Sequence, residues 1–168
     1  DGPGFYLWAA LVEEVVKYLA VYFVVLRSPE FDEPVDAMIY MLTAALGFAA
    51  MENILVINRV LVDGFSATVG LWSLRFAGAT LLHTLSSALL GYFIALAWFY
   101  FDHRKALFVI GLALATVFHW SFNLFISQMH QSVSLLFSTL LLMAMAFLVS
   151  TLFDKIKEHD GQVTPTIV

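Results

Sequence analysis

The stretch that decides the fold is VSLLFSTLLLMAMAFLVSTLF, which runs from Val133 to Phe153. It has 21 residues and no charged side chain, and a helix needs roughly twenty apolar residues to cross a bilayer. Helix is the state expected in lipid, because an open sheet would leave the backbone groups of its edges unpaired. The sequence therefore predicts a transmembrane helix here.

Four earlier stretches are also long and predominantly apolar, and they run from Phe5 to Arg27, from Ala37 to Val62, from Leu71 to Phe101 and from Ala106 to Ser127. Short polar or turn-forming segments separate them. We therefore expect an all-α fold, a polytopic transmembrane helix bundle of about five spanning helices. The bundle would occupy residues 1–153, and a polar C-terminal tail residues 154–168.

The composition agrees with a lipid environment. Hydrophobic residues make up 61% of the chain and charged residues 12%, whereas a soluble domain is usually about half apolar and a quarter charged. The net charge of −5, without a basic run, argues against nucleic acid as a partner. The absence of cysteine excludes disulfides and thiolate metal sites. The chain starts without Met or a basic n-region, and we expect helices upstream of it.

The basic residues predict the orientation in a cell membrane. With five crossings, one side receives Arg27, Arg104, Lys105, Lys155 and Lys157, and the other only Arg59 and Arg75. Because Lys and Arg concentrate on the cytoplasmic side, we expect a cytoplasmic C-terminus and an outer N-terminus. Arg75, near a helix end, is expected to extend its charge to the membrane surface.

Eight polar residues lie well inside the predicted spans, and each ionisable one costs roughly 2.5–3.5 kcal/mol at mid-membrane. They are Glu13, Glu14, Lys17, Glu52, Asn53, His83, His119 and Asn123. At about 1.5 Å per residue, four of them lie ~12 to ~18 Å below the outer ends of their helices. These four are Glu13, Glu52, His83 and His119. We therefore expect them to converge on one pocket in the outer half of the bilayer.

Local spacing supports this convergence. Glu13 lies four residues and Glu14 three residues before Lys17, which are the spacings of helical ion pairs. His119 and Asn123 project from one helix face. Any one of these residues alone is more often a hydrogen-bond partner between helices than a catalyst, but together at one depth they favour a functional site.

These residues form ordered motifs. The first is Glu13-Glu14-x-x-Lys17. The second combines Phe31-Asp32-x-x-x-Asp36 with Gly47-Phe48-Ala49-x-x-Glu52-Asn53-Ile54-Leu55; His83 and then His119-x-x-x-Asn123 follow. The pattern, from roughly Leu11 to Phe125, resembles the PrsW family of intramembrane proteases. It is less similar to the related type II CAAX prenyl endopeptidases, because Ala79 stands four residues before His83 and Lys17 ends the first motif.

The resemblance implies a mechanism and a substrate. Glu13 would be the general base, with His83 helping to hold the water, and His119 and Asn123 would donate hydrogen bonds to the oxyanion. Glu14 would also belong to the catalytic residues, and Lys17, Glu52 and Asn53 would support the site. The substrate would be a single-span membrane protein, such as an anti-sigma factor, cut near the outer face. Spacing leaves open which of Glu13 and Glu14 is the base.

Several alternatives remain. We expect no cofactor, although two His and one Glu (His83, His119 and Glu13) also suit a catalytic zinc ion. Motifs of zincins, serine hydrolases and intramembrane aspartyl proteases are absent from the sequence. Ser86 and Ser87 follow His83 on the same helix, which makes a Ser–His nucleophile pair awkward. The alternative functions are a proton- or ion-coupled transporter, a CAAX-type prenyl-protein endopeptidase, and an inactive scaffold that binds membrane helices.

Overall fold

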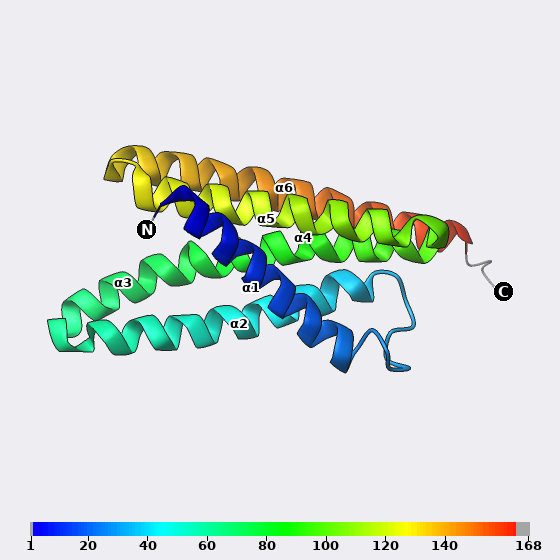
Figure 1. Cartoon of the computed structure of the whole chain (residues 1–168), viewed down its shortest axis with the longest axis horizontal. Coiled ribbons are helices and arrows are strands. Elements are labelled where there is room, and N and C mark those ends of the chain that lie inside the picture. The colour runs from blue at the N-terminus through cyan, green and yellow to red at the C-terminus, as the bar shows by residue number, and fades with distance from the viewer. Residues whose placement is uncertain (1, 164–168) are drawn as a thin grey trace.

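The computed structural model describes residues 2–163, and every regular element in this part of the chain is helical (Figure 1). The α-helices are α1 (Pro3–Val24), α2 (Asp36–Val60), α3 (Phe65–Ala77), α4 (Ala79–Phe99), α5 (Arg104–Gln128) and α6 (Gln131–Val163). Two short 3-10 helices lie between them, η1 (Leu61–Asp63) between α2 and α3 and η2 (Phe101–His103) between α4 and α5. The predicted all-α bundle is therefore confirmed.

Four segments within the described residues are long and apolar enough to span a membrane, namely Asp36–Val60, Thr68–Phe99, Phe101–Gln128 and Ser132–Gly161. The fifth expected crossing, α1, has 22 residues but carries Glu13, Glu14 and Lys17. The chain is thus a multi-pass membrane protein by its helices. The orientation of these helices in the membrane stays a prediction.

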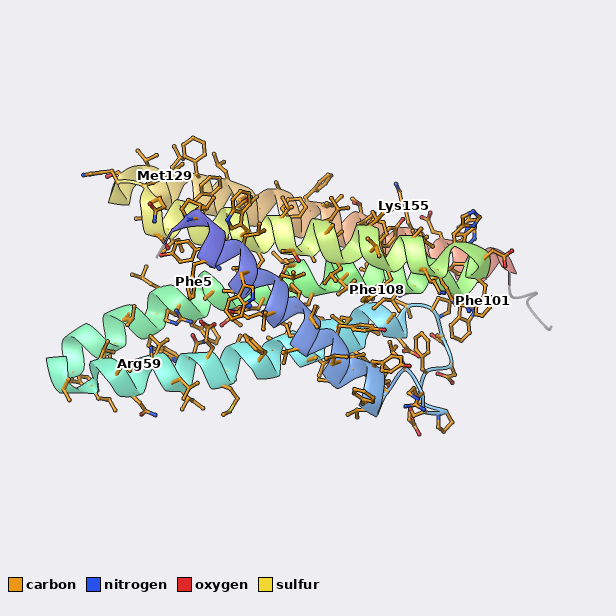
Figure 2. The ribbon with its side chains drawn as sticks, in the orientation of Figure 1. Phe5, Arg59, Phe101, Phe108, Met129 and Lys155 are labelled. Carbon is orange, nitrogen blue, oxygen red and sulfur yellow. The ribbon has the colours of Figure 1, made fainter. Side chains whose placement is uncertain are left out.

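Helix α4 lies at the centre of the bundle. It packs most extensively against α2 and α5, α6 covers α4 and α5, and α1 crosses the front of the bundle obliquely (Figure 1). Figure 2 shows Arg59 near the turn between α2 and α3, and Phe101 and Lys155 toward the opposite end. The α2–α3 turn and the basic end of α6 therefore lie at opposite ends of the molecule.

The stretch expected as one helix from Leu71 to Phe101 is in fact two helices that meet at Gly78, and it begins earlier, at Phe65. The Gly78 amide still donates to the Leu74 carbonyl at 2.9 Å, so the chain bends here without forming a loop. A Cβ atom at Gly78 would lie 3.1 Å from that carbonyl oxygen and 3.4 Å from the Phe122 ring. On the N-terminal side of this bend, α3 packs against α2 and lies apart from α5 and α6 (Figure 1).

Small residues allow α2 and α4 to approach closely. A Cβ atom at Gly91 would lie 2.7 Å from both the Ala37 carbonyl oxygen and the Met38 Cα atom. Ala45 and Ala49 of α2 are almost fully buried. Close approach of this kind is how membrane helices gain packing energy, since lipid offers no hydrophobic driving force between them.

The motif Phe31-Asp32-x-x-x-Asp36 shapes the turn before α2. The Asp36 carboxylate accepts hydrogen bonds from the backbone amides of Asp32 and Glu33 at 3.3 and 3.0 Å. The Phe31 ring meets the Trp98 ring edge-on, with 5.1 Å between centroids. This motif therefore has a structural role at the C-terminal end of α4.

Helix α6 extends into the predicted polar tail and ends at Val163. The remainder of that tail, residues 164–168, lies outside the described residues. The division into residues 1–153 and 154–168 therefore stays a prediction.

Candidate active site

Glu14 is the most enclosed acidic residue of the site. It lies on the buried face of α1 with Ala10, Lys17 and Val21, which recur at helical spacing. Its Oε1 accepts hydrogen bonds from Lys17 Nζ at 2.6 Å, from Ser86 Oγ at 2.9 Å and from His119 Nδ1 at 2.9 Å.

Ser87 donates to the other oxygen, Oε2, at 2.7 Å. The Glu14 side chain is fully buried, and both of its oxygens are thus occupied by donors from α1, α4 and α5.

Glu13 points to the open edge of the same cluster. Its side chain is 26% exposed, and its Oε2 lies 3.4 Å from His119 Nε2 and 3.9 Å from His83 Nδ1. Adjacent helix positions point about 100° apart, which is why Glu13 reaches this edge while Glu14 enters the bundle. Spacing allowed Lys17 to pair with either glutamate, and it pairs with Glu14 at 2.6 Å.

The contacts of His83 assign its tautomer. Lys17 Nζ lies 3.1 Å from Nδ1, and Glu52 Oε2 lies 2.8 Å from Nε2. An ammonium only donates and a carboxylate only accepts, so Nδ1 carries the lone pair and Nε2 the proton. The Phe48 ring packs edge-on against the imidazole, with centroids 5.3 Å apart.

His119 is held in the corresponding way from α5. Its Nδ1–H donates to Glu14, and its Nε2 faces Glu13. The rings of His119 and His83 meet edge-on, with centroids 4.8 Å apart. Each imidazole therefore has one nitrogen fixed by a buried or half-buried carboxylate and the other directed toward the space next to Glu13.

Arg75 belongs to this site, contrary to the expectation that its charge would extend to the membrane surface. Its Nη2 lies 3.1 Å from Glu52 Oε2, and its Nε donates to Asn53 Oδ1 at 2.9 Å. Asn53 donates in turn to Thr80 Oγ1 at 3.2 Å. The bend at Gly78 explains the difference, because it lays α3 against the α2 face that carries Glu52 and Asn53.

Asn123 lies one turn after His119 and is partly buried. Among residues 2–163, its side chain makes no hydrogen bond or ion pair. The structure thus brings together Glu13, Glu14, Lys17, Glu52, His83 and His119, with Asn53 attached through Arg75. Asn123 shares a helix with this cluster without joining its hydrogen bonds.

Two serines and Arg75 join the cluster although the sequence did not place them there. Ser86 and Ser87 are not nucleophiles paired with His83; both donate to Glu14. Their position on α4, three and four residues after His83, was the available signal, because such residues share a helix face.

The formal charges nearly balance. Three carboxylates, those of Glu13, Glu14 and Glu52, face two fixed cations, Lys17 and Arg75. One negative charge remains, and a single proton on an imidazole would neutralise it. Neutrality matters here, because an unbalanced charge in a medium of low dielectric constant is costly.

The cluster also has the donor set of a metal centre. One ligand atom each from Glu13, His83 and His119 lies within 4.8 Å of the others. Two imidazoles and one carboxylate form a known catalytic zinc set, and carboxylates that hold the remaining imidazole N–H groups are typical of such centres. These side chains fit zinc, provided that Lys17 releases His83 Nδ1.

The same residues lie within the region that matches a known family. The family described as "PrsW family intramembrane metalloprotease" matches residues 2–152. The chain belongs to the PrsW family.

Its similar curated relatives carry the same family name. "Protease PrsW" of Geobacillus kaustophilus is 35% identical over 119 residues, which cover 68% of this chain and 50% of that protein. "Protease PrsW" of Oceanobacillus iheyensis is 28% identical over 114 residues, again 68% and 50% of the two chains. This PrsW-family chain thus spans about half the length of the curated relatives it matches, and no solved structure is significantly similar to it.

Proposed function

We propose that this PrsW-family chain carries the catalytic site of an intramembrane protease that hydrolyses a peptide bond in a single-span membrane protein. One observation carries the proposal. The Glu13 carboxylate faces nitrogen atoms of two imidazoles, His83 and His119, inside a helix bundle.

Glu13 is the general base in this proposal. Both oxygens of Glu14 already accept hydrogen bonds, so Glu14 has little capacity left for water. Glu13 is partly open and is not held by any of these donors. It would take a proton from a water molecule bound between its carboxylate and the imidazoles. Its Oε2 lies 3.9 Å from His83 Nδ1, a separation that a water molecule can bridge.

His119 and Asn123 would stabilise the oxyanion that forms next. His119 donates Nδ1–H to Glu14, and with the balancing proton on Nε2 it presents a second N–H toward the Glu13 side. The Asn123 amide is one turn away and is free of partners within the described residues. Fixed donors in a site with little water stabilise developing charge strongly. Protonated Glu13 would then return its proton to the leaving amine.

Zinc would use the same three side chains. Glu13, His83 and His119 would hold the ion, and a bound zinc ion supplies Lewis acidity toward a carbonyl group or a water molecule. In both versions Glu14 and Glu52 orient the imidazoles. We propose the version without metal, because Lys17 already donates to His83 Nδ1 and one proton completes the charge balance.

The proposed substrate is an anti-sigma-factor-like protein, cut in the outer half of the bilayer. Glu52 lies eight residues before the end of α2 and His119 nine residues before the end of α5. The cluster therefore lies in the half of the bundle where α2 meets α3 (Figure 1). The basic residues favour this cluster end as extracytoplasmic.

The test is cleavage of a single-span substrate by the purified protein in liposomes. We expect Glu13→Gln, His83→Ala and His119→Ala each to abolish cleavage while the helical content is kept. Arg59→Gln is the matched control, since Arg59 is exposed on α2 and outside the cluster. Cleavage that survives all three changes would refute the site, and proton-coupled flux without cleavage would favour a transporter.

A further inference from the structure

We propose that Arg75 is a positioning residue that fixes the orientation and tautomer of His83 through Glu52. The inference rests on the proposed function, because it assigns Arg75 a part in preparing that same site. Within the described chain, α3 supplies no residue to the contacts of Glu13. Arg75 would connect this helix to the catalytic cluster.

The link is a short chain of contacts. His83 Nε2 and Arg75 Nη2 both approach Glu52 Oε2, at 2.8 and 3.1 Å. The carboxylate oxygen is thus shared between an imidazole on α4 and a guanidinium on α3. The Glu52 side chain is 35% exposed, so packing alone does not hold it in place.

Arg75 is itself held by a second chain of contacts. Its Nε donates to Asn53 Oδ1 at 2.9 Å, and Asn53 Nδ2 donates to Thr80 Oγ1 at 3.2 Å. Thr80 lies one turn before His83 on α4. The planar guanidinium therefore has two contacts that differ in direction, which a lysine ammonium cannot reproduce with the same geometry.

This arrangement decides which nitrogen of His83 faces Glu13. Glu52 accepts the proton of Nε2, which leaves the Nδ1 lone pair next to Lys17 and 3.9 Å from Glu13. Without Arg75, Glu52 would lose its cationic partner and could swing away from Nε2. His83 could then turn its ring or move its proton, and the lone pair near Glu13 would be lost for part of the time.

A purely structural role of Arg75 would have a different experimental consequence. If Arg75 only attached α3 to α2, its loss would lower stability and leave the histidine ring unchanged in the protein that remains folded. The test therefore needs a signal from His83 itself.

The first arm is nitrogen NMR of the protein in nanodiscs, with ¹⁵N-labelled histidine and a metal chelator present. The His83 signals are assigned by their loss in His83→Gln, and we expect the wild type to show a protonated Nε2. In Arg75→Gln we expect these signals to shift toward those of a mixture of tautomers, as in the positive control Glu52→Gln. Arg59→Gln should leave them unchanged.

The second arm is cleavage of the single-span substrate. Loss of a partner that orients a metal-binding imidazole typically costs roughly 10- to 100-fold in activity, and we expect a loss of kcat of about that size in Arg75→Gln, with little change in KM. Arg75→Lys keeps the charge and should recover part of kcat. Arg75→Met, which also removes the charge, replaces Arg75→Gln if that variant is unstable.

The outcomes separate this inference from the proposed function. Unchanged His83 signals in folded Arg75→Gln or Arg75→Met, with altered signals in Glu52→Gln, would overturn the role of Arg75 even if the wild type cleaves its substrate. A wild type that cleaves nothing would overturn the proposed function, while the NMR arm would still decide whether Arg75 positions His83.

Discussion

Replacement of Glu14 by glutamine tests the division of labour between the two adjacent glutamates. Glu14 is fully buried and is the ion-pair partner of Lys17, whose side chain is also fully buried. Glutamine keeps the shape and one acceptor oxygen but removes the negative charge. Lys17 would then be a buried cation without its anionic partner.

The magnitude follows from these contacts. Removal of one member of a buried ion pair costs about 3–5 kcal/mol. We therefore expect Glu14→Gln to lower the free energy of unfolding by about that amount. Glu13 is 26% exposed and its contacts are longer, so Glu13→Gln should cost less than about 1 kcal/mol, as for a poorly buried pair.

A double-mutant cycle with Lys17→Met isolates the pair. The double variant removes both charges, and the amide introduced by Glu14→Gln can still accept from Ser86 or His119 through its remaining oxygen. We expect the double variant to be more stable than the sum of the single changes predicts, with an interaction free energy of roughly 2 kcal/mol, within the range for residues in contact.

The assay is reversible unfolding in mixed micelles, followed by helical circular dichroism. Equal destabilisation by Glu14→Gln and Glu13→Gln would show that the two carboxylates do not differ in burial. Strict additivity in the cycle would show that Glu14 and Lys17 do not interact. Either result would remove the reason for assigning the base to Glu13.

Three further predictions address packing, the oxyanion and the metal. Gly91→Ala should destabilise the protein by about 1–3 kcal/mol in the same unfolding assay, because the added Cβ would meet the backbone of Met38. Gly47→Ala is the control: nothing lies within 4 Å of its added Cβ, so it should be neutral or stabilise the protein by up to about 1 kcal/mol. Asn123→Ala should lower kcat by roughly 100-fold, the effect of losing one oxyanion donor, and leave the free energy of unfolding unchanged; an unaltered kcat would exclude Asn123 from the reaction. Cleavage should continue after dialysis against a chelator, whereas a loss that zinc restores would replace the metal-free version by one with zinc held by Glu13, His83 and His119.

The composition of the cluster could be predicted because helix geometry links position to depth. Glu13, Glu52, His83 and His119 fall at similar distances from one end of their helices, and antiparallel packing of neighbouring helices places equal depths side by side. The structure brings these four side chains together. Depth was sufficient to predict that these side chains meet, because polar and ionisable residues inside a membrane face the interior of the bundle.

The identity of each partner could not be predicted in the same way. Depth and spacing allowed Lys17 to pair with either glutamate, and only the rotation of α1 about its axis selects Glu14. For Arg75 the sequence favoured the membrane surface, because the bend at Gly78 is not visible in a continuous apolar stretch. A single glycine in such a stretch is compatible with a straight helix as well as with a bend.

Glu13 and His119 are the pair on which the proposed chemistry depends, and their separation can be measured directly. In membrane-embedded protein, the dipolar coupling between a ¹³C-labelled Glu13 carboxyl carbon and His119 ¹⁵Nε2 reports this distance, with Glu13→Ala to assign the signal. We expect a clear coupling, because Oε2 lies 3.4 Å from Nε2 and the carboxyl carbon is bonded directly to Oε2. The absence of a detectable coupling would mean that the two side chains point apart, and Glu13 could not then act with these imidazoles on a shared water molecule.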